Sequence, residues 1–422
     1  MSSNIYERIE KARKILEEGD EFRILTHYDV DGVCSAGIIA HYLAKKDKRF
    51  HISFFRNIDA DAILEIIEKE DYVILTDMGA SFASKLEGNV IVLDHHKPQG
   101  DNDKIAYVNP HFFGYDGSHD ACASTLAYML TEDKSMAKFF LAGVFGDKQH
   151  LGGFTGLNRE LFEKLGIKLT KDLALYGNVL NAILYSTEPF FPGLSGRRDA
   201  VEKMLKEIGI PVTKEIKDLN EEEKIKLTSL LSLNLIKHSK VPSAPELVVD
   251  LDVFMGESIR YLAELIDSAA RTDNQSIALS YILGSSEAID KMELLRREHK
   301  SEVIDGVYDM LDNLFEMEHI QYFFVKNNYL TGSISTIAAL YLLDPHKAIL
   351  ALYVDDMVHI SARASRELAS RVHLGDIMRK VASQLQGQGG GHNIAAGATI
   401  PKGMEEEFLE RVDREIGKSL SS

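Results

Sequence analysis

Three short apolar runs, each followed at once by residues that commonly bind metal ions, constrain this sequence more than any other feature. The ligand-type residues are His27, Asp29 and Asp31 after residues 22–26, Asp77 after residues 72–76, and Asp94, His95 and His96 after residues 89–93. Short apolar runs bounded by polar residues are typical of buried strands in parallel sheets. Because ligands of open parallel sheets bind at the carboxyl ends of the strands, we expect the three groups to meet in one crevice.

The first part of the chain alternates strand-like and helix-like patterns. An amphipathic helix is expected from Ile5 to near Gly19, and another strand-like run covers residues 51–56. Helical patterns over residues 32–46 and 59–69 separate the apolar runs. Such alternation predicts βαβ units, a parallel sheet and helices on both of its faces.

The rest of the chain is mainly helical until a second α/β pattern begins near residue 318. A chain of 422 residues is long enough for two or three domains. We predict an α/β fold divided into a catalytic domain at residues 1–198, a mostly helical section at 199–285, a linker helix at 286–317 and a smaller C-terminal α/β domain at 318–422.

Composition limits the class of protein. The formal net charge of −17 argues against a generally cationic nucleic-acid coat, so a polyanion would have to be met by a local patch. Cys34 and Cys122 fall in apolar helical patterns, which fits a reducing compartment. No apolar stretch reaches the ~18–20 residues of a membrane span, and the N-terminus lacks a signal-peptide core. We therefore expect a cytoplasmic protein with no membrane partner.

The spacing of the ligand-type residues favours a shared metal site over separate turns. In an extended segment alternate side chains point the same way, so His27, Asp29 and Asp31 are able to face one centre. A turn with a helix cap is the alternative explanation for this triplet, and a turn former is the alternative for Asp77. Asp147 follows the apolar run 139–145, where an acid is costly to bury unless it is paired or bound to a cation. The alternative for Asp147 is an exposed helix end.

Two further segments are candidates for binding substrate. Residues 386–392 are expected to form a loop whose three glycines, Gly389, Gly390 and Gly391, let backbone N–H groups approach an anion. A flexible turn is the alternative. The Pro-rich and Gly-rich loop at residues 189–196 either connects two helices or brings Arg197 beside a substrate cleft.

These motifs together resemble those of the DHH phosphoesterase family, whose name is spelled by Asp94-His95-His96. The family's other motifs match His27, Asp29 and Asp31, then Asp77, then Gly146-Asp147. Its C-terminal companion, the DHHA1 domain, is similar at Gly389-Gly390-Gly391-His392 and at Arg363. Within the family, the size of the chain and its 189–196 loop most resemble the archaeal RecJ-like nucleases.

The resemblance implies two divalent metal ions, with Mn²⁺ preferred and Mg²⁺ as the alternative. One ion would be held by His27, Asp29 and Asp77, and the other by Asp31, Asp77, His95 and Asp147. His96 would face the scissile phosphate, and Asp94 would orient a ligand imidazole. The DHHA1 residues Arg363, Gly389, Gly390, Gly391 and His392 would clamp a terminal nucleotide, with Arg197 beside the cleft.

The function implied is hydrolysis of single-stranded DNA or RNA from an end by two-metal activation of water. Two alternatives stay open. The first is a phosphodiesterase or phosphatase for small substrates such as nanoRNA, cyclic dinucleotides or nucleotide bisphosphates. The second is a replication-associated factor that binds GINS or other replication and repair proteins. The sequence leaves open the polarity of digestion, the preferred sugar, the substrate length and the oligomeric state.

Overall fold

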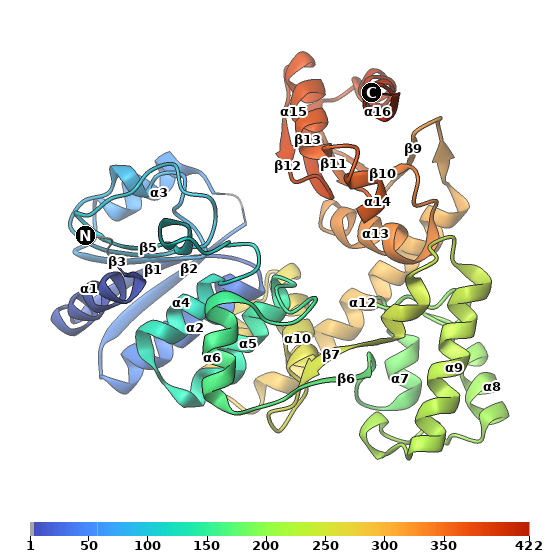
Figure 1. Ribbon diagram of the computed structural model, residues 1–422, viewed down its shortest axis with the longest axis horizontal. Coiled ribbons are helices and arrows are strands. Elements are labelled where there is room, and N and C mark those ends of the chain that lie inside the picture. Colours follow the sequence, from blue (N-terminus) through green and yellow to red (C-terminus); the bar gives the residue numbers. More distant parts are fainter. Residues whose placement is uncertain (1–3, 57, 422) are drawn as a thin grey trace. The chain divides into compact units, whose positions relative to one another are not determined.

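A computed structural model of the chain describes residues 4–56 and 58–421 (Figure 1). Contacts divide the chain into two compact units. The N-terminal unit contains the described residues up to Lys171 together with Leu251–Arg297, and the C-terminal unit contains Asp172–Asp250 and the residues from Glu298 onward. The four segments expected from the sequence remain a prediction about domain boundaries, and each unit is described here by itself.

The N-terminal unit is built on a parallel five-stranded sheet with the order β2-β1-β3-β4-β5. Its strands are β1 (Glu21–His27), β2 (Arg49–Phe55), β3 (Tyr72–Thr76), β4 (Asn89–Leu93) and β5 (Ala106–Val108). The predicted parallel sheet is confirmed. The sequence analysis missed β5, which has only three residues and no alternating pattern long enough to recognise.

Helices cover both faces of this sheet, as predicted (Figure 1). Ile24, Ile74 and Ile91 pack into a large core on one face. Leu25, Val73 and Val92 point the other way, into a smaller core that includes Ile63 of α3 (Ala60–Ile67). The large core is shared with α1 (Ile5–Glu18), α2 (Val30–Lys45), α4 (Ala123–Thr131), α5 (Ala137–Gly146), α6 (Gly156–Leu165), α10 (Ile259–Arg271) and α11 (Gln275–Ile282).

The C-terminal unit contains a mixed six-stranded sheet with the order β12-β13-β11-β10-β9-β8. Only β9 and β10 pair in parallel, and the other neighbours are antiparallel. The strands are β8 (Phe315–Glu316), β9 (Ile320–Phe324), β10 (Ala348–Val354), β11 (Met357–Arg363), β12 (Gln388–Gly391) and β13 (Ala395–Pro401). The predicted C-terminal α/β architecture is confirmed.

Helices again cover both faces of the C-terminal sheet. Ile349 packs on the side of α13 (Thr331–Ile337), whereas Leu350 packs on the side of α15 (Leu374–Gln384) and α16 (Glu405–Ser421). The remaining elements of the chain are the helices α7 (Val179–Leu184), α8 (Arg198–Ile208), α9 (Glu221–His238), α12 (Ala288–Asp312) and α14 (Arg366–Ala369), and the two-stranded sheet of β6 (Leu169–Leu173) and β7 (Val249–Val253).

The glycine-rich segment differs from its prediction. We expected a loop over residues 386–392, but Gln388–Gly391 form β12, an edge strand paired with β13. A Cβ on Gly389 would lie 2.6 Å from the carbonyl oxygen of Met378, so the missing side chain lets α15 pack directly against this strand. The prediction of a loop was wrong because it read the glycines as residues that either expose the backbone to an anion or form a turn. Their other use is close packing of a helix on a strand.

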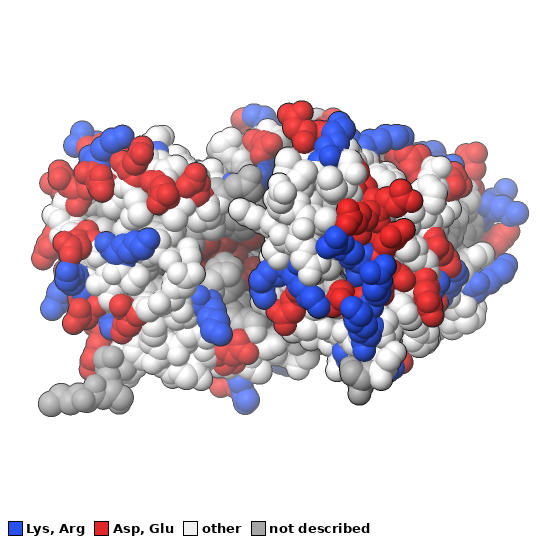
Figure 2. Space-filling model, turned by 90° about the horizontal axis from the view of Figure 1, so that it is seen from above, with Lys and Arg blue, Asp and Glu red and all other residues white. Residues whose placement is uncertain are grey.

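Charges of both signs are mixed on the surface. Figure 2 shows Lys and Arg side chains interspersed with Asp and Glu on one face, without a large area of positive charge. Three cations of the segment 361–392 are tied to neighbours: Arg379 to Asp376, Lys380 to Glu415, and Arg371 to the carbonyl of Leu420. Across residues 4–56 and 58–421 no helix combines the length and apolar character needed to cross a bilayer.

The turn from β1 into α2 gives the first testable prediction. A Cβ on Gly32 would come 2.1 Å from the carbonyl oxygen of His27, which is backbone and has no room to move. We expect Gly32→Ala to lower the free energy of unfolding of the N-terminal unit by about 1–3 kcal/mol, despite the higher helix propensity of alanine. Urea denaturation followed by circular dichroism measures this change.

Gly100→Ala is the matched control, because a Cβ there meets only Ser84, at an ordinary 3.5 Å. Equal unfolding midpoints for the two variants would contradict this account of the turn.

Candidate metal centre

The ligand-type residues lie at one edge of the N-terminal sheet. His27 is the last residue of β1, Asp77 follows β3 directly and His95 follows β4 by two positions. Since β1, β3 and β4 are neighbours and parallel, their carboxyl ends meet at the same edge. The strand order reverses between β1 and β3, which is where sheets of this kind bind ligands.

The first group of side chains surrounds His27. Its Nδ1 atom lies 2.9 Å from Oδ2 of Asp29 and 3.3 Å from Oδ2 of Asp77. Asp29 caps the N-terminus of α2, where its Oδ1 accepts a hydrogen bond from the Gly32 N–H. Asp77 has a φ of 56°, a left-handed conformation that a short polar side chain tolerates. The predicted spacing of His27 and Asp29 therefore does bring both to one point.

The second group surrounds His95. Its Nε2 atom lies 3.2 Å from Oδ1 of Asp77, 3.3 Å from Oδ2 of Asp147 and 3.9 Å from Oδ2 of Asp31. On the other side of the ring, Nδ1 donates a hydrogen bond to the carbonyl oxygen of Gly117 at 2.6 Å. Asp77 thus offers one carboxylate oxygen to each group, and Nε2 of His95 faces the acids.

Asp31 is fully buried at the N-terminus of α4. Its Oδ2 accepts from the Ala123 N–H at 2.6 Å and its Oδ1 from the Ser124 N–H at 2.9 Å. Free N–H groups and the helix dipole both favour a negative charge at such a position. Nothing in the sequence indicated that Asp31 lies at this helix N-terminus, because α4 begins about ninety residues after Asp31.

Asp147 caps the carboxyl end of α5, and its Oδ2 atom is buried with no hydrogen-bond partner among the described residues. A buried carboxylate oxygen without a donor is unfavourable unless a cation is near. One turn earlier, a Cβ on Gly143 would come 2.6 Å from Oδ1 of Asp31. The absence of a side chain there lets α5 lie against Asp31 and bring Asp147 to the site.

Asp94 and His96 form a separate pair beside these groups. Oδ1 of Asp94 accepts from Nδ1 of His96 at 2.8 Å, and Oδ2 accepts from the Ala80 N–H at 2.6 Å. Asp94 is buried, whereas the side chain of His96 is 58% exposed and its Nδ1 lies 3.9 Å from Oδ1 of Asp77. The imidazole that Asp94 orients is therefore that of His96, while Gly117 orients His95.

The pKa values of these residues show how strongly the acids repel one another. Burial, and then the charge of Asp77, raise the pKa of Asp29 and raise that of Asp31 to about 6. Burial and the Asp31 charge raise the pKa of Asp147 well above its usual range. Burial would lower the pKa of His27, but its hydrogen bonds with Asp29 and Asp77 outweigh it and raise the pKa to about 11.

Asp77 and His95 complete this electrostatic pattern. Burial would raise the pKa of Asp77, yet hydrogen bonds from His27 and His95 hold it below its usual range. Burial would lower the pKa of His95, but its hydrogen bond with Asp77 and the charges of Asp147 and Asp31 raise it well above its usual range. The site therefore brings together buried carboxylates whose mutual repulsion has to be offset by protons or cations. The orphaned oxygen of Asp147 and a donor set of carboxylate oxygens and imidazole nitrogens both fit divalent ions such as Mn²⁺ or Mg²⁺.

One cysteine lies closer to the site than the sequence suggested. Sγ of Cys122 is within 4.8 Å of ligand atoms of Asp31 and Asp147. Burial, and then the Asp31 charge, raise the pKa of this thiol well above its usual range, which disfavours the thiolate form that binds metals. An apolar helical pattern predicted the burial of Cys122 but gave no sign of its neighbours.

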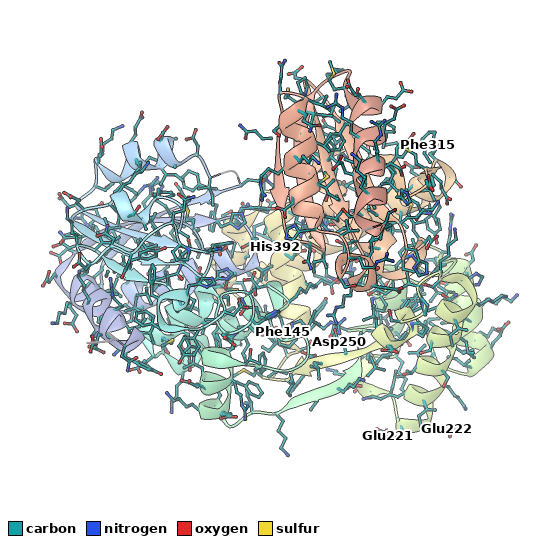
Figure 3. All side chains as sticks on the ribbon, turned by 45° about the horizontal axis from the view of Figure 1, so that its top comes forward. Phe145, Glu221, Glu222, Asp250, Phe315 and His392 are labelled. Atoms are coloured by element: carbon teal, nitrogen blue, oxygen red, sulfur yellow. The ribbon has the colours of Figure 1, made fainter. Side chains whose placement is uncertain are left out.

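The residues expected to bind substrate lie in the C-terminal unit. Arg363 ends β11, where its Nε donates to Oγ1 of Thr336 at 3.1 Å and its Nη1 donates to Oγ of Ser361 at 3.1 Å. In register, Ser361 faces Gly397 of β13, which faces Gly390 of β12, so these three positions share one face. His392, labelled in Figure 3, follows β12 and is exposed.

A groove of about 410 Å³ crosses the same strands. Polar side chains line much of this groove. Among them, Nδ1 of His359 lies 3.4 Å from Oγ1 of Thr399, and Nε2 of the same ring lies 3.4 Å from Oδ1 of Asp355. The lining residues include Asn328, Thr331, His359, Gln388, Gly397 and Thr399. The sequence analysis did not find this groove, because its polar residues are scattered over strands that pair only in the fold.

Arg197 is also placed in the C-terminal unit. It precedes α8, and its guanidinium lies 4.3 Å from the centre of the Tyr308 ring. This contact with an aromatic face accounts for its position. A role in binding substrate stays a prediction for Arg197.

Comparison with protein families gives two matches in this chain. The model described as "DHH family, N-terminal domain" matches residues 21–144, which include His27, Asp77 and His95. The model described as "DHHA1 domain" matches residues 318–418, which include Arg363 and His392. An uncharacterised protein of Methanocaldococcus jannaschii is 30% identical over 442 residues, covering 98% of each chain.

Solved structures share the fold at low sequence identity. CDC45 from Entamoeba histolytica aligns with a TM-score of 0.65 at 12% identity and covers 99% of both chains. RecJ from Thermus thermophilus, in complex with Mn²⁺, aligns with a TM-score of 0.57 at 15% identity over 98% of this chain and 55% of its own. An exonuclease RecJ bound to manganese aligns with a TM-score of 0.57 at 16% identity, covering 99% and 95%.

The pKa pattern predicts that cation binding releases protons. In the absence of a cation the raised pKa values of His27, His95 and Asp147 favour the protonated forms of these side chains, and a bound cation would displace those protons. Because protons compete with the cation, the apparent Mn²⁺ affinity should increase as the pH rises from 6 to 8. Calorimetric titrations in buffers of different ionisation enthalpy measure the released protons. An affinity independent of pH, without proton release, would contradict the assignment.

Proposed function

Because the chain belongs to the DHH family and carries that family's DHHA1 domain, we propose that it is a metal-dependent exonuclease. Its reaction would be hydrolysis of phosphodiester bonds in single-stranded DNA or RNA, starting from an end. The observation that carries this proposal is the position of Asp77, whose two carboxylate oxygens face His27 on one side and His95 on the other. A carboxylate shared between two ligand groups is what a two-metal phosphoesterase requires.

The ligand groups would divide between two ions. His27, Asp29 and Asp77 would hold one, and Asp77 would share the other with Asp31, His95 and Asp147. When bound, such a pair polarises a phosphoryl oxygen and acidifies a water molecule. Mn²⁺ is the preferred candidate and Mg²⁺ the alternative. The RecJ structures with the same fold, solved with Mn²⁺ or Mg²⁺, support this choice.

His96 is suited to act on the substrate rather than to hold an ion. Its hydrogen bond with Asp94 raises the pKa of the imidazole, so that His96 carries positive charge more readily than a free histidine. A half-exposed cationic imidazole is able to stabilise the negative charge that grows on phosphate, or to donate a proton to the leaving oxygen. Asp94 would keep the ring in the orientation needed for either role.

The C-terminal sheet would hold the end of the strand. Arg363 offers a guanidinium suited to a phosphate, and Gly390 of β12, where a Cβ would meet only the Arg379 side chain at 3.7 Å, leaves its backbone open to close approach. The groove beside His359 and Thr399 has a volume within the range of small-ligand sites, and its polar lining offers hydrogen bonds to a nucleotide. We propose that Arg363, Gly389, Gly390, Gly391 and His392 bind the terminal nucleotide. A local site of this kind suits a chain whose net charge is −17.

Two other functions have some support. The strongly acidic charge favours a phosphodiesterase for small substrates such as nanoRNA or cyclic dinucleotides. The likeness to CDC45, which spans 99% of both chains, favours a replication-associated factor with GINS or related proteins as partners. A substrate-length series separates the enzymatic alternatives. Oligomers of DNA and RNA, from dinucleotides upward and labelled at either end, would be digested with Mn²⁺ and with Mg²⁺.

An exonuclease would shorten long oligomers from one end and would not favour dinucleotides. Cleavage confined to dinucleotides would instead establish the small-substrate alternative. Absence of hydrolysis on every substrate with both ions would reject an enzymatic role and leave the replication factor.

The central residue gives a direct test. Asp77→Asn keeps the size of the side chain but removes the charge that both ligand groups share, so hydrolysis should fall by more than about 100-fold, since even outer partners of metal ligands cost 10–100-fold. Circular dichroism should show an unchanged fold. Asp101→Asn, a change to an exposed aspartate paired with Arg8, is the control and should retain activity. Substantial Mn²⁺-dependent turnover by the Asp77 variant would reject the two-metal site.

A further inference from the structure

A line of buried hydrogen bonds ends on the carbonyl that orients His95. Oγ1 of Thr125 donates to Oδ1 of Asn158 at 2.5 Å, and Nδ2 of Asn158 donates to Oε1 of Gln149 at 2.7 Å. Nε2 of Gln149 then donates to the carbonyl oxygen of Gly117 at 2.9 Å. The same oxygen accepts the Nδ1–H of His95. Residues on α4 and α6 are thereby connected to a predicted metal ligand.

The direction of every bond in this line is fixed. The carbonyl oxygen of Gly117 only accepts, so the N–H₂ of Gln149 faces it and Oε1 of Gln149 faces Asn158. The N–H₂ of Asn158 must then face Gln149, which leaves Oδ1 of Asn158 to accept from the Thr125 hydroxyl. All three side chains are almost fully buried, with Gln149 only 2% exposed. A buried amide that is satisfied at both ends has one orientation.

Gln149 is held in place by the end of α5. Its N–H donates to the carbonyl of Val144 at 3.0 Å, and Lys148 before it adopts a left-handed φ of 58°. His150 after it stacks on Phe145, labelled in Figure 3, with ring centres 4.0 Å apart. The helix end that positions Asp147 therefore also positions Gln149, two residues later.

Gly117 has no regular structure to fix its carbonyl. It lies in a turn segment, and a Cβ there would come 1.8 Å from the carbonyl oxygen of His95, so only glycine fits. Nε2 of Gln149 donates to the Gly117 oxygen at 2.9 Å and to the Ala121 carbonyl at 3.3 Å, so this side chain binds the loop at two points, and His95 binds the same Gly117 oxygen. Ligand imidazoles commonly depend on such a second partner to fix ring orientation and tautomer.

We propose that Gln149 is a positioning residue for His95. Through Gly117 it keeps the proton on Nδ1, so that Nε2 presents its lone pair to the group formed with Asp77 and Asp147. This inference rests on the proposed metal site. It further implies that loss of the Gln149 amide weakens ion binding at the His95 group and spares the His27 group, which meets His95 only through the shared Asp77.

The test compares three variants of the full chain. Gln149→Met fills the same volume without a hydrogen bond, and Gln149→Glu keeps an acceptor for Asn158 but has no donor for Gly117. Gln275→Met is the control, because Gln275 is also a buried glutamine whose Nε2 donates to a backbone carbonyl, that of Ala270 at 3.1 Å. Mn²⁺ binding is measured by calorimetry and electron paramagnetic resonance, and thermal unfolding checks that each variant folds.

We expect both Gln149 variants to weaken one of two Mn²⁺ sites by about 10–100-fold and to leave the other unchanged. The Gln275 variant should bind as the natural chain does. Equal binding by natural chain and Gln149→Met would show that the side chain only fills space, and equal weakening of both sites would show general damage. Either result overturns the proposal.

A second readout does not need the metal. Nitrogen-15 NMR of the imidazoles, followed as the pH is raised until His95 loses one proton, reports which ring nitrogen keeps the other, and should change from Nδ1–H alone to a mixture in Gln149→Met. An unchanged His95 signal overturns the positioning role even if no Mn²⁺ binds. Failure of the proposed nuclease function is seen separately, as absence of phosphodiester hydrolysis by a chain that still shows the Gln149 effect.

Discussion

The interaction on which the structure depends is the pair of contacts that one buried carboxylate makes with two imidazoles. Asp77 reaches His27 at 3.3 Å through one oxygen and His95 at 3.2 Å through the other. Three more acids, Asp29, Asp31 and Asp147, complete the two groups, and burial makes their mutual repulsion strong. Such a concentration of negative charge is stable only if protons or cations compensate it. The surrounding fold has to hold these groups together against that repulsion.

The fold holds these groups together through close contacts that only glycine allows. Gly32 lets α2 begin directly against the end of β1, and Gly143 lets α5 lie against Asp31. The N-terminus of α4 supplies N–H donors to Asp31, which offsets part of the cost of burying it. The sheet brings the residues that follow β1, β3 and β4 close together, because these three neighbouring parallel strands end at one edge. The clustering of these acids and imidazoles therefore depends on helix termini and glycine contacts as much as on the strands that carry them.

Sequence reasoning picked out the candidate ligands because their signal is local. Apolar runs such as residues 72–76 mark a strand, and a charged residue directly after the run marks its end, so convergence followed from the rule for parallel sheets. The groups that hold these residues in place were missed because they come from distant segments. They are Gln149, Gly117 and the N–H groups of α4, and none of them belongs to a recognisable sequence pattern. The glycine-rich strand β12 was read as a loop because turn formation and close packing use the same residue type. The order of the strands and the polar groove of the C-terminal sheet depend on pairing, which no local pattern encodes.

The most direct test of the two-ion site is anomalous diffraction from crystals of the chain grown with Mn²⁺. The account predicts two anomalous peaks, one beside His27 and Asp29 and the other beside Asp31, His95 and Asp147, with Asp77 between them. A single peak, or peaks away from Asp77, would contradict it.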